Sequence, residues 1–283
     1  MFARLFAYVQ YLLPKYLLTA IIYRIARIKS QGFKNFLIKH FVKLYDVETN
    51  DILLPLPDGF ATFNEFFTRE LADGARPIDA DARSIVSPVD GTVSQAGSLR
   101  DTEILQAKGI DYSLDDLLAI NLDEARAFAN GRFATIYLAP YNYHRVHAPL
   151  AGKLVSGSYV PGDLFSVNTA TATHIRGLFR RNERLILNFE TAAGQAALIF
   201  VGALNVGSIT TPWTGEIRPR HKGVVESIDL GDQPIDIAKG DLLGWFNMGS
   251  TVILLLPDGV ADWNDSMVAG NTLRMGETIG ALT

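Results

Sequence analysis

Two of the chain's five histidines lie close together, in a segment whose residue types could transfer protons. His144 and His147 are three positions apart, between Pro140 and Pro149. The prolines favour a loop or the end of a strand over a helix. In a strand, a spacing of three puts the two side chains on opposite faces. We therefore expect different roles for the two histidines, although structural histidines with ordinary hydrogen bonds remain an alternative.

A serine that directly follows a glycine is the second candidate for chemistry. Gly249, Ser250 and Thr251 come just before the apolar segment 252–256. Such a triplet is usually a turn before a buried strand. A serine that attacks the peptide bond preceding it would need an uncluttered carbonyl and a backbone that tolerates strain, and glycine supplies both. From the residues alone, both interpretations stay open.

An aspartate in the segment 87–93 is the third candidate. Asp90 follows Pro88 and precedes Gly91, which is the pattern of a turn capped by an aspartate. The functional interpretation is a carboxylate that orients a histidine. Taken singly, none of the three candidates is decisive.

Charge is distributed unevenly along the 283 residues. Eight of the 26 lysines and arginines lie before Asp46, whereas all 30 acidic residues lie at or after it. A cationic head on an acidic body indicates attraction to an anionic surface. The acidic body makes nucleic acid a poor candidate partner. The chain has no cysteine, so disulfides, thiolate catalysis and cysteine-based zinc sites are excluded.

The head, residues 1–45, is apolar as well as basic. Charges and Pro14 interrupt its apolar stretches, which are therefore too short to span a bilayer. In the segment 33–44 the apolar and basic residues are spaced to lie on opposite sides of one helix, with Phe33, Phe36, Leu37, Phe41 and Leu44 against Lys34, Lys39 and Lys43. This pattern is typical of a helix that lies in the membrane interface. The alternative is a helical hairpin packed on its own domain.

The rest of the chain, residues 46–283, has the pattern of a β-rich domain. Short apolar runs separated by Gly and Pro indicate mostly antiparallel strands, the clearest being 133–138, 152–160, 185–189, 196–201 and 251–256. We expect a short helix over 63–71, capped by Thr62, and another over 113–128, capped by Ser113. The predicted fold class is α+β, with membrane-associating helices at the N-terminus followed by a β-rich catalytic domain.

Taken together, these segments resemble the phosphatidylserine decarboxylase family in its bacterial and mitochondrial branch. The similarity runs in order through roughly residues 60–260, in the segments 62–67, 74–78, 87–93, 143–149, 161–168, 182–184 and 201–209, and in the intact triplet Gly249-Ser250-Thr251. One departure is Met248, where many members carry leucine. Because the reacting atoms belong to Gly249 and Ser250, this difference should matter little.

The resemblance implies a pyruvoyl-dependent enzyme that makes its own prosthetic group. Ser250, His147 and Asp90 would act together to cut the chain between Gly249 and Ser250, giving a β chain of residues 1–249 and an α chain of residues 250–283. Ser250 would become the covalent pyruvoyl group. Through a Schiff base with this group, the enzyme would convert phosphatidylserine to phosphatidylethanolamine in phospholipid biosynthesis. The resemblance assigns reprotonation of the substrate to His144 and needs no metal ion.

The resemblance also gives the membrane-like head a use. A two-chain lipid does not leave the bilayer readily, at about 0.8 kcal/mol per buried CH₂, so the active site must approach the headgroup. We expect a peripheral enzyme on the cytoplasmic face of the cell membrane, bound to phosphatidylserine in an anionic bilayer. The two chains would stay associated after cleavage, and family resemblance suggests a homodimer.

Three other functions fit parts of the same pattern. The runner-up is a membrane-associated lipid hydrolase in which Ser250, His147 and Asp90 act on substrate in an uncut chain. A metallohydrolase would use His144 and His147 with His174 or Asp90, but the sequence identifies no third ligand. The non-enzymatic alternative is a membrane-binding β scaffold.

Overall fold

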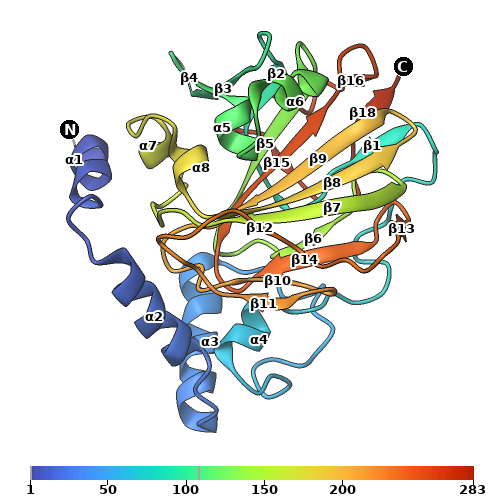
Figure 1. Cartoon of the computed structure of the whole chain (residues 1–283). Helices are drawn as coiled ribbons and strands as arrows, with labels where there is room; N and C mark the ends of the chain where they lie inside the picture. Colours follow the sequence, from blue (N-terminus) through green and yellow to red (C-terminus); the bar gives the residue numbers. More distant parts are fainter. Residues whose placement is uncertain (1, 108) are drawn as a thin grey trace.

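The computed structural model describes residues 2–107 and 109–283. Three helices form the head, and the remaining helices are short and lie between strands (Figure 1). The helices are α1 (Phe2–Val9), α2 (Lys15–Ala26), α3 (Gln31–Tyr45), α4 (Phe63–Phe67), α5 (Leu114–Leu118), α6 (Leu122–Ala125), the 3₁₀ helix η1 (Arg126–Phe128), α7 (Thr169–Ala172) and α8 (Leu178–Arg181).

The centre of the body is a large antiparallel sheet. Its order is β12 (Glu226–Ser227), β7 (Gly152–Val160), β8 (Arg184–Thr191), β9 (Gly194–Val201), β15 (Ser250–Leu256), β5 (Arg132–Leu138), β2 (Gly91–Ser98) and β17 (Thr272–Leu273), and β13 (Ile235–Ile237) pairs with β7. Strand β15 lies between β9 and β5, with Ser250 opposite Leu138 and Thr251 opposite Val201.

Three smaller sheets surround the large one. The first has the order β11 (Gly215–Ile217), β10 (Ile209–Thr211), β14 (Leu242–Phe246), β6 (Arg145–His147). The second is β1 (Ser84–Val86), β18 (Thr278–Leu282), β16 (Ala261–Trp263), and the third is β3 (Glu103–Ala107) with β4 (Ile110–Ser113). The α+β class with N-terminal helices is therefore confirmed.

Strand β15 is buried along its whole length. All seven residues, Ser-Thr-Val-Ile-Leu-Leu-Leu, are buried. A strand with both faces covered reads as a continuous apolar run, without the alternation of a half-exposed strand. The chain therefore brings the Gly249–Ser250 linkage to the edge of its main hydrophobic core, where Ser250 pairs with β5 and the next residue, Thr251, pairs with both β5 and β9.

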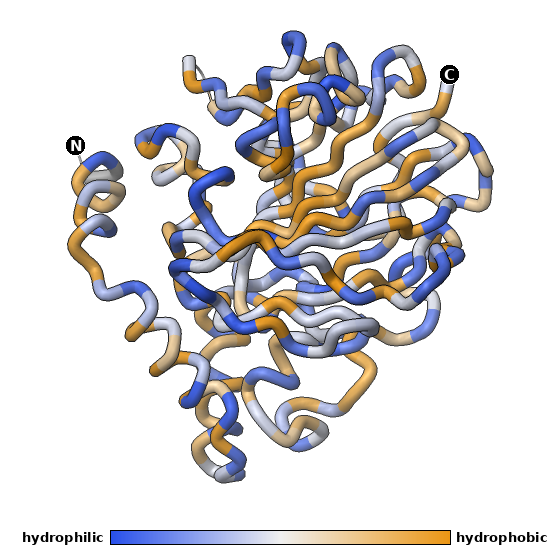
Figure 2. The backbone as a smooth tube through the Cα atoms, viewed as in Figure 1, coloured by the Kyte–Doolittle hydropathy of each residue, from blue (hydrophilic) through white to orange (hydrophobic). Residues whose placement is uncertain are grey.

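Helix α1 packs on the main core through Ala7, whereas α2 and α3 pack on the body through a second, smaller hydrophobic cluster. Ala26 of α2 and Ile38 of α3 join Phe63, Phe66 and Phe67 of α4 in it, and Met248 packs against it from the body. Many residues of the head are nevertheless hydrophobic (Figure 2), and many of their side chains stay exposed. The exposed side chains are Leu5, Phe6, Tyr8, Val9, Tyr11, Leu12, Leu17, Ile21, Ile28, Phe33, Phe36, Leu44 and Tyr45. The packed hairpin and the exposed apolar surface thus occur together.

Helix α3 differs from its expected two-sided pattern. Lys34 is buried, and its ammonium donates to the carbonyl of Pro57 at 3.1 Å. Leu37 and Phe41 are partly buried against the α4 cluster, whereas Phe36 and Leu44 are exposed. The apolar residues are divided between the body and the surface because α3 packs on α4. Across residues 2–107 and 109–283, no helix has both the length and the apolar character to cross a bilayer.

Two predicted helices are shorter than expected. Helix α4 has the expected cap, with the Glu65 amide donating to Thr62 Oγ1 at 3.1 Å, but it ends at Phe67. The single helix expected over 113–128 is wrong. It is divided into α5, α6 and η1, because Ala119 takes a left-handed conformation and Asn121 starts a new helix with its own cap.

Candidate active site

Ser250 is the first residue of the central strand, and its hydroxyl is buried without a partner. Its side chain is 1% exposed, and within residues 2–107 and 109–283 nothing hydrogen-bonds to Ser250 Oγ. An unsatisfied buried polar group costs about 1–3 kcal/mol. Such a group in a native fold calls for an explanation, and a catalytic role is one of those available.

Gly249 has the backbone conformation that a left-handed turn requires. Its φ is +22°, in the region that side chains with a Cβ rarely adopt. A Cβ built there would meet no atom within 4 Å, so a larger residue would have space. The reason for glycine at this position is therefore the backbone angle. The peptide bond before Ser250 therefore starts from a residue with an unusual backbone angle, and the Cβ position of that residue is open space.

Asn247 fixes the segment that leads into this linkage. It is buried, its amide donates to the Ser208 carbonyl at 3.0 Å, and its Nδ2 donates to Ser208 Oγ at 2.8 Å and Thr210 Oγ1 at 2.9 Å. Its Oδ1 accepts from Asn64 Nδ2 at 3.0 Å, which connects the segment to α4. The backbone is thus held on one side by these bonds and on the other by β15.

His147 is held as a neutral imidazole with an unprotonated Nε2. Its Nδ1 lies 2.8 Å from the carbonyl oxygen of Gly240, which can only accept, so Nδ1 carries the proton. The Tyr143 hydroxyl lies 3.1 Å from Nε2 and donates to it. Burial lowers the pKa of His147, partly offset by the Gly240 hydrogen bond and the charge of Asp90. This is the tautomer that a general base acting through Nε2 needs.

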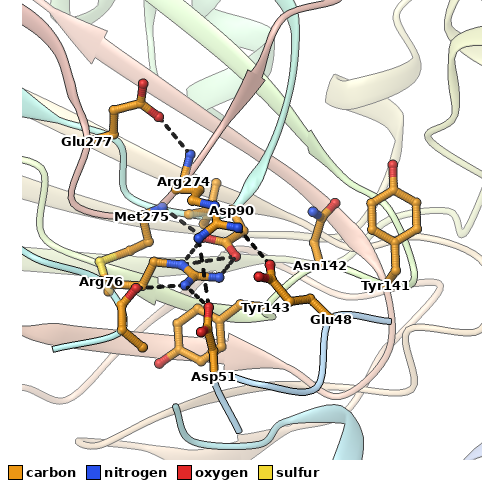
Figure 3. Close-up of polar contacts among 12 residues, drawn as sticks. Glu48, Asp51, Arg76, Asp90, Tyr141, Asn142, Tyr143, Arg274, Met275 and Glu277 are labelled. Atoms are coloured by element: carbon orange, nitrogen blue, oxygen red, sulfur yellow. Dashed lines mark hydrogen bonds and ion pairs between the residues drawn. The ribbon is translucent and has the colours of Figure 1, made fainter. Parts of the chain in front are cut away.

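Asp90 makes its hydrogen bonds to groups other than a histidine. Its Oδ1 accepts from Arg76 Nε at 2.9 Å and the Met275 amide at 2.8 Å, and its Oδ2 accepts from Arg76 Nη2 at 2.6 Å (Figure 3). Among the described residues no hydrogen bond joins Asp90, His147 and Ser250 to one another. Asp90 acts on His147 here through its charge, and the triad stays a prediction.

His144 occupies surroundings different from those of His147. It is fully buried against the Phe67 ring, with ring centroids 4.1 Å apart, and its Nδ1 donates to the Asn142 carbonyl at 2.8 Å. Its Nε2 is buried, and the described residues give it no partner. Burial and then the charge of Arg69 lower the pKa of His144 to about 3. The ring is therefore neutral near pH 7.

The metallohydrolase alternative finds no ligand set in the described part of the chain. There, no group of three His, Cys, Asp or Glu side chains is arranged to hold a metal ion. His174 lies just after α7, and its Nδ1 donates to the Ala170 carbonyl at 2.8 Å.

Three partners of the candidate residues were not assigned roles from sequence. Arg76 and Tyr143 lie in segments that the resemblance includes, but spacing gives no sign of what they contact. The Gly240 carbonyl is a backbone group 93 positions from His147. The pairing of β6 with β14 brings Gly240 next to His147. Arg76 reaches Asp90 from the loop between α4 and β1.

Comparison with known proteins identifies the family of the chain. A family model described as phosphatidylserine decarboxylase matches residues 63–281, and a second, described as PSD, matches residues 5–46. The chain is 46% identical over 279 residues to a phosphatidylserine decarboxylase proenzyme of Chromobacterium violaceum, covering 98% of this chain and 99% of the relative. It is 43% identical over 278 residues to the corresponding proenzyme of Methylococcus capsulatus, covering 98% and 96%.

These matches define the class of protein as a decarboxylating lyase made as a proenzyme. The chain belongs to the phosphatidylserine decarboxylase family. The family resemblance read from its motifs is therefore confirmed.

Proposed function

We propose that this chain cuts itself between Gly249 and Ser250 and then decarboxylates phosphatidylserine to phosphatidylethanolamine at the modified residue 250. The observation that carries the proposal is the buried Ser250 hydroxyl, which has no hydrogen-bond partner among the described residues and directly follows a positive-φ glycine at the start of the central strand. Its relatives are named proenzymes, which fits a chain that is processed.

Self-cleavage begins with the Ser250 hydroxyl. Its Oγ attacks the carbonyl carbon of Gly249 while His147 Nε2 takes the hydroxyl proton and returns it to the leaving nitrogen, so an ester replaces the amide. Elimination of that ester frees the Gly249 carboxylate and leaves dehydroalanine, and addition of water with loss of ammonia leaves a ketone. In the structure the Tyr143 hydroxyl donates to His147 Nε2. The Ser250 hydroxyl therefore either displaces the Tyr143 hydroxyl from Nε2 or passes its proton to Nε2 through it.

The residues around position 250 fit the pyruvoyl group that results. The linkage has room beside Gly249, and the unpaired Ser250 oxygen leaves no hydrogen bond to be broken. When formed, the group would supply an electron sink of the kind that pyridoxal phosphate provides.

His144 would hold the proton that the substrate carbon needs. Its Nε2 is unprotonated in the structure, because Nδ1 donates to Asn142 and burial disfavours the cation. A nearby anionic headgroup would favour the charged ring and so allow His144 to take up a proton before donating it.

The head would bring this site to the lipid. The exposed apolar side chains of α1–α3 and the absence of acidic residues before Asp46 suit the interface of an anionic membrane. We place the enzyme peripherally, on the cytoplasmic face of the cell membrane. Flotation with vesicles tests this: binding should require phosphatidylserine or another anionic lipid and weaken as salt rises.

An apolar pocket connects the head to the cleavage site. It has a volume of about 250 Å³ and is lined by α2, α3, Phe63 and Met248. Because Met248 directly precedes Gly249, an acyl chain in this pocket would place the headgroup close to residue 250.

Intact-mass measurement of the recombinant protein tests the proposal. We expect a fragment of residues 1–249 and a fragment of residues 250–283 whose first residue has lost its amine. Ser250→Ala and His147→Ala should remain full-length. A single uncut wild-type chain that reacts with a covalent serine probe would instead support the hydrolase alternative.

A further inference from the structure

Arg76 is a buried cation that forms ion pairs beside the proposed site. It lies in the loop between α4 and β1, in the segment 74–78 that the sequence comparison singles out, and its side chain is 7% exposed. Its Nε and Nη2 donate to the two oxygens of Asp90, and its Nη1 donates to Asp51 Oδ2 at 2.7 Å. The guanidinium thus bridges two carboxylates (Figure 3).

This arrangement fixes the plane of the Asp90 carboxylate. A guanidinium that donates to both oxygens has only one favourable orientation, which a lysine ammonium cannot reproduce. The Met275 amide donates to Oδ1 from the other side at 2.8 Å. Asp90 is therefore held by one residue from each of the two chains that cleavage would produce.

The charges of the cluster favour the Arg76 cation. Burial disfavours the Arg76 cation, but its hydrogen bonds and the charges of Asp90 and Asp51 outweigh this and raise its pKa. Asp51 in turn follows the head, a few residues after α3 ends at Tyr45. The cluster lines a cavity of about 270 Å³ that Asn142, Tyr143 and Arg274 also line.

We propose that Arg76 is a positioning residue for self-cleavage: it holds the Asp90 carboxylate in one orientation, so that the carboxylate can stabilise His147 as it becomes cationic. The inference rests on the proposed function, because it gives Asp90 a role in the cut. Asp51 supports Arg76 from behind and does not touch Asp90 in this network.

A purely structural ion pair is the competing explanation. Breaking a buried pair destabilises a fold whether or not the pair takes part in chemistry, so loss of activity alone does not separate the two. The pH dependence of cleavage separates the two explanations, because only a positioning role connects Arg76 to a proton-transfer step.

Arg274 offers a matched control in the same cluster. Its side chain is 57% exposed, and its Nη2 donates to Glu48 Oε2 at 2.7 Å and its Nη1 lies 3.8 Å from Asp51 Oδ2. It shares Asp51 with Arg76, but its guanidinium makes no hydrogen bond to Asp90 in the described structure. Removing its charge changes the cluster without releasing Asp90.

The experiment follows cleavage of full-length chain made by cell-free translation, by intact mass over time, between pH 5.5 and 9. We expect Arg76→Gln to cut at least about tenfold more slowly, and its half-maximal rate to fall at a different pH, since the carboxylate that stabilises cationic His147 is no longer held in one orientation. Arg76→Lys should fall between this variant and the wild type. Arg274→Gln should stay within about twofold of the wild type with an unchanged pH profile.

Each result has one meaning. An Arg76→Gln chain that cuts at the wild-type rate with the wild-type pH profile overturns the inference, as does an equal shift in Arg274→Gln. If Arg76→Gln does not fold, as judged by circular dichroism, Arg76→Lys decides by the same criterion. A wild-type chain that is never cut contradicts the proposed function instead.

Discussion

Strand β15 buries its apolar residues, whereas the head leaves many similar residues exposed. Leu254 lies inside the large sheet and is 1% exposed, whereas Leu12, just after α1, is 86% exposed. In β15 both faces are buried, and β9 and β5 pair with its two edges. In the head only part of each helix packs on the body: α1 through Ala7, and α2 and α3 through Ala26, Ile38 and the α4 cluster.

This difference separates the two tasks of the proposed enzyme. The buried strand holds a reacting linkage in one geometry and keeps water away from it, and both requirements favour dense packing. The head needs apolar surface that is free until it meets a membrane. The central sheet should therefore be sensitive to change in its chemistry and stability, and the head in its binding.

The largest expected effect is on catalysis at the buried site. His144→Ala should still be cut at Gly249–Ser250, but its decarboxylation rate should fall by about 10²–10⁴-fold, the usual contribution of a positioned acid or base. Release of CO₂ from phosphatidylserine in mixed micelles measures this, with intact mass as the control for cleavage. A cut variant with full activity would remove His144 from the proposed mechanism.

A matched pair of leucine substitutions tests the packing difference directly. Leu254→Ala should lower the free energy of unfolding by about 2–5 kcal/mol, because it leaves a cavity in a fully covered strand. Leu12→Ala should change it by less than about 0.5 kcal/mol, as surface substitutions usually do. Urea titrations of both variants measure the two values, and similar losses would contradict the contrast.

Buried ionisable groups should also make the stability of the body depend on pH. Glu183 is buried, and burial raises its pKa to about 7 although the Tyr159 hydroxyl donates to its Oε2 at 2.6 Å. The pKa of Glu183 is higher in the folded state than in the unfolded state, so the protonated carboxyl favours folding. Its contribution to stability is complete below about pH 4.5 and is lost as pH rises through about 7. The slope is up to about 1.4 kcal/mol per pH unit.

Glu183→Gln removes that dependence, since an amide does not titrate in this range. From pH 5 to pH 8 the unfolding free energy of the wild type should therefore fall relative to that of the variant. His144 acts in the opposite direction, but it is present in both proteins and cancels in the difference. A difference that does not change with pH would show that Glu183 is ionised in the fold.

The smallest expected effect on stability, and a clear one on binding, belongs to the head. Leu12→Ala combined with Leu44→Ala should leave unfolding within about 1 kcal/mol of the wild type. Binding to anionic vesicles should weaken, because each leucine contributes about 1.5–3 kcal/mol when fully buried. Sedimentation with vesicles measures the affinity, and unchanged binding would mean that these side chains do not enter the membrane.

Much of the fold could be read from local pattern. The continuous apolar run at 251–256 predicted a buried strand, and Thr62 with Glu65 predicted the start of α4. The helix expected over 113–128 failed because amphipathic spacing does not reveal a left-handed residue such as Ala119. The prediction that Lys34 lies on the basic side of its helix failed for another reason. A loop 23 residues later covers Lys34, and helical periodicity gives no information on such a contact.

The sequence by itself determined which residues could react, since Gly249, Ser250, Asp90 and the two histidines are recognisable from their types and neighbours. It also determined the family. Only the tertiary structure decided which of their atoms are free or paired: His147 bonds to Gly240, Asp90 to Arg76, and Ser250 Oγ to no described group. Hydrogen bonds depend on distance and direction between atoms from remote segments, and only the packed sheets fix those.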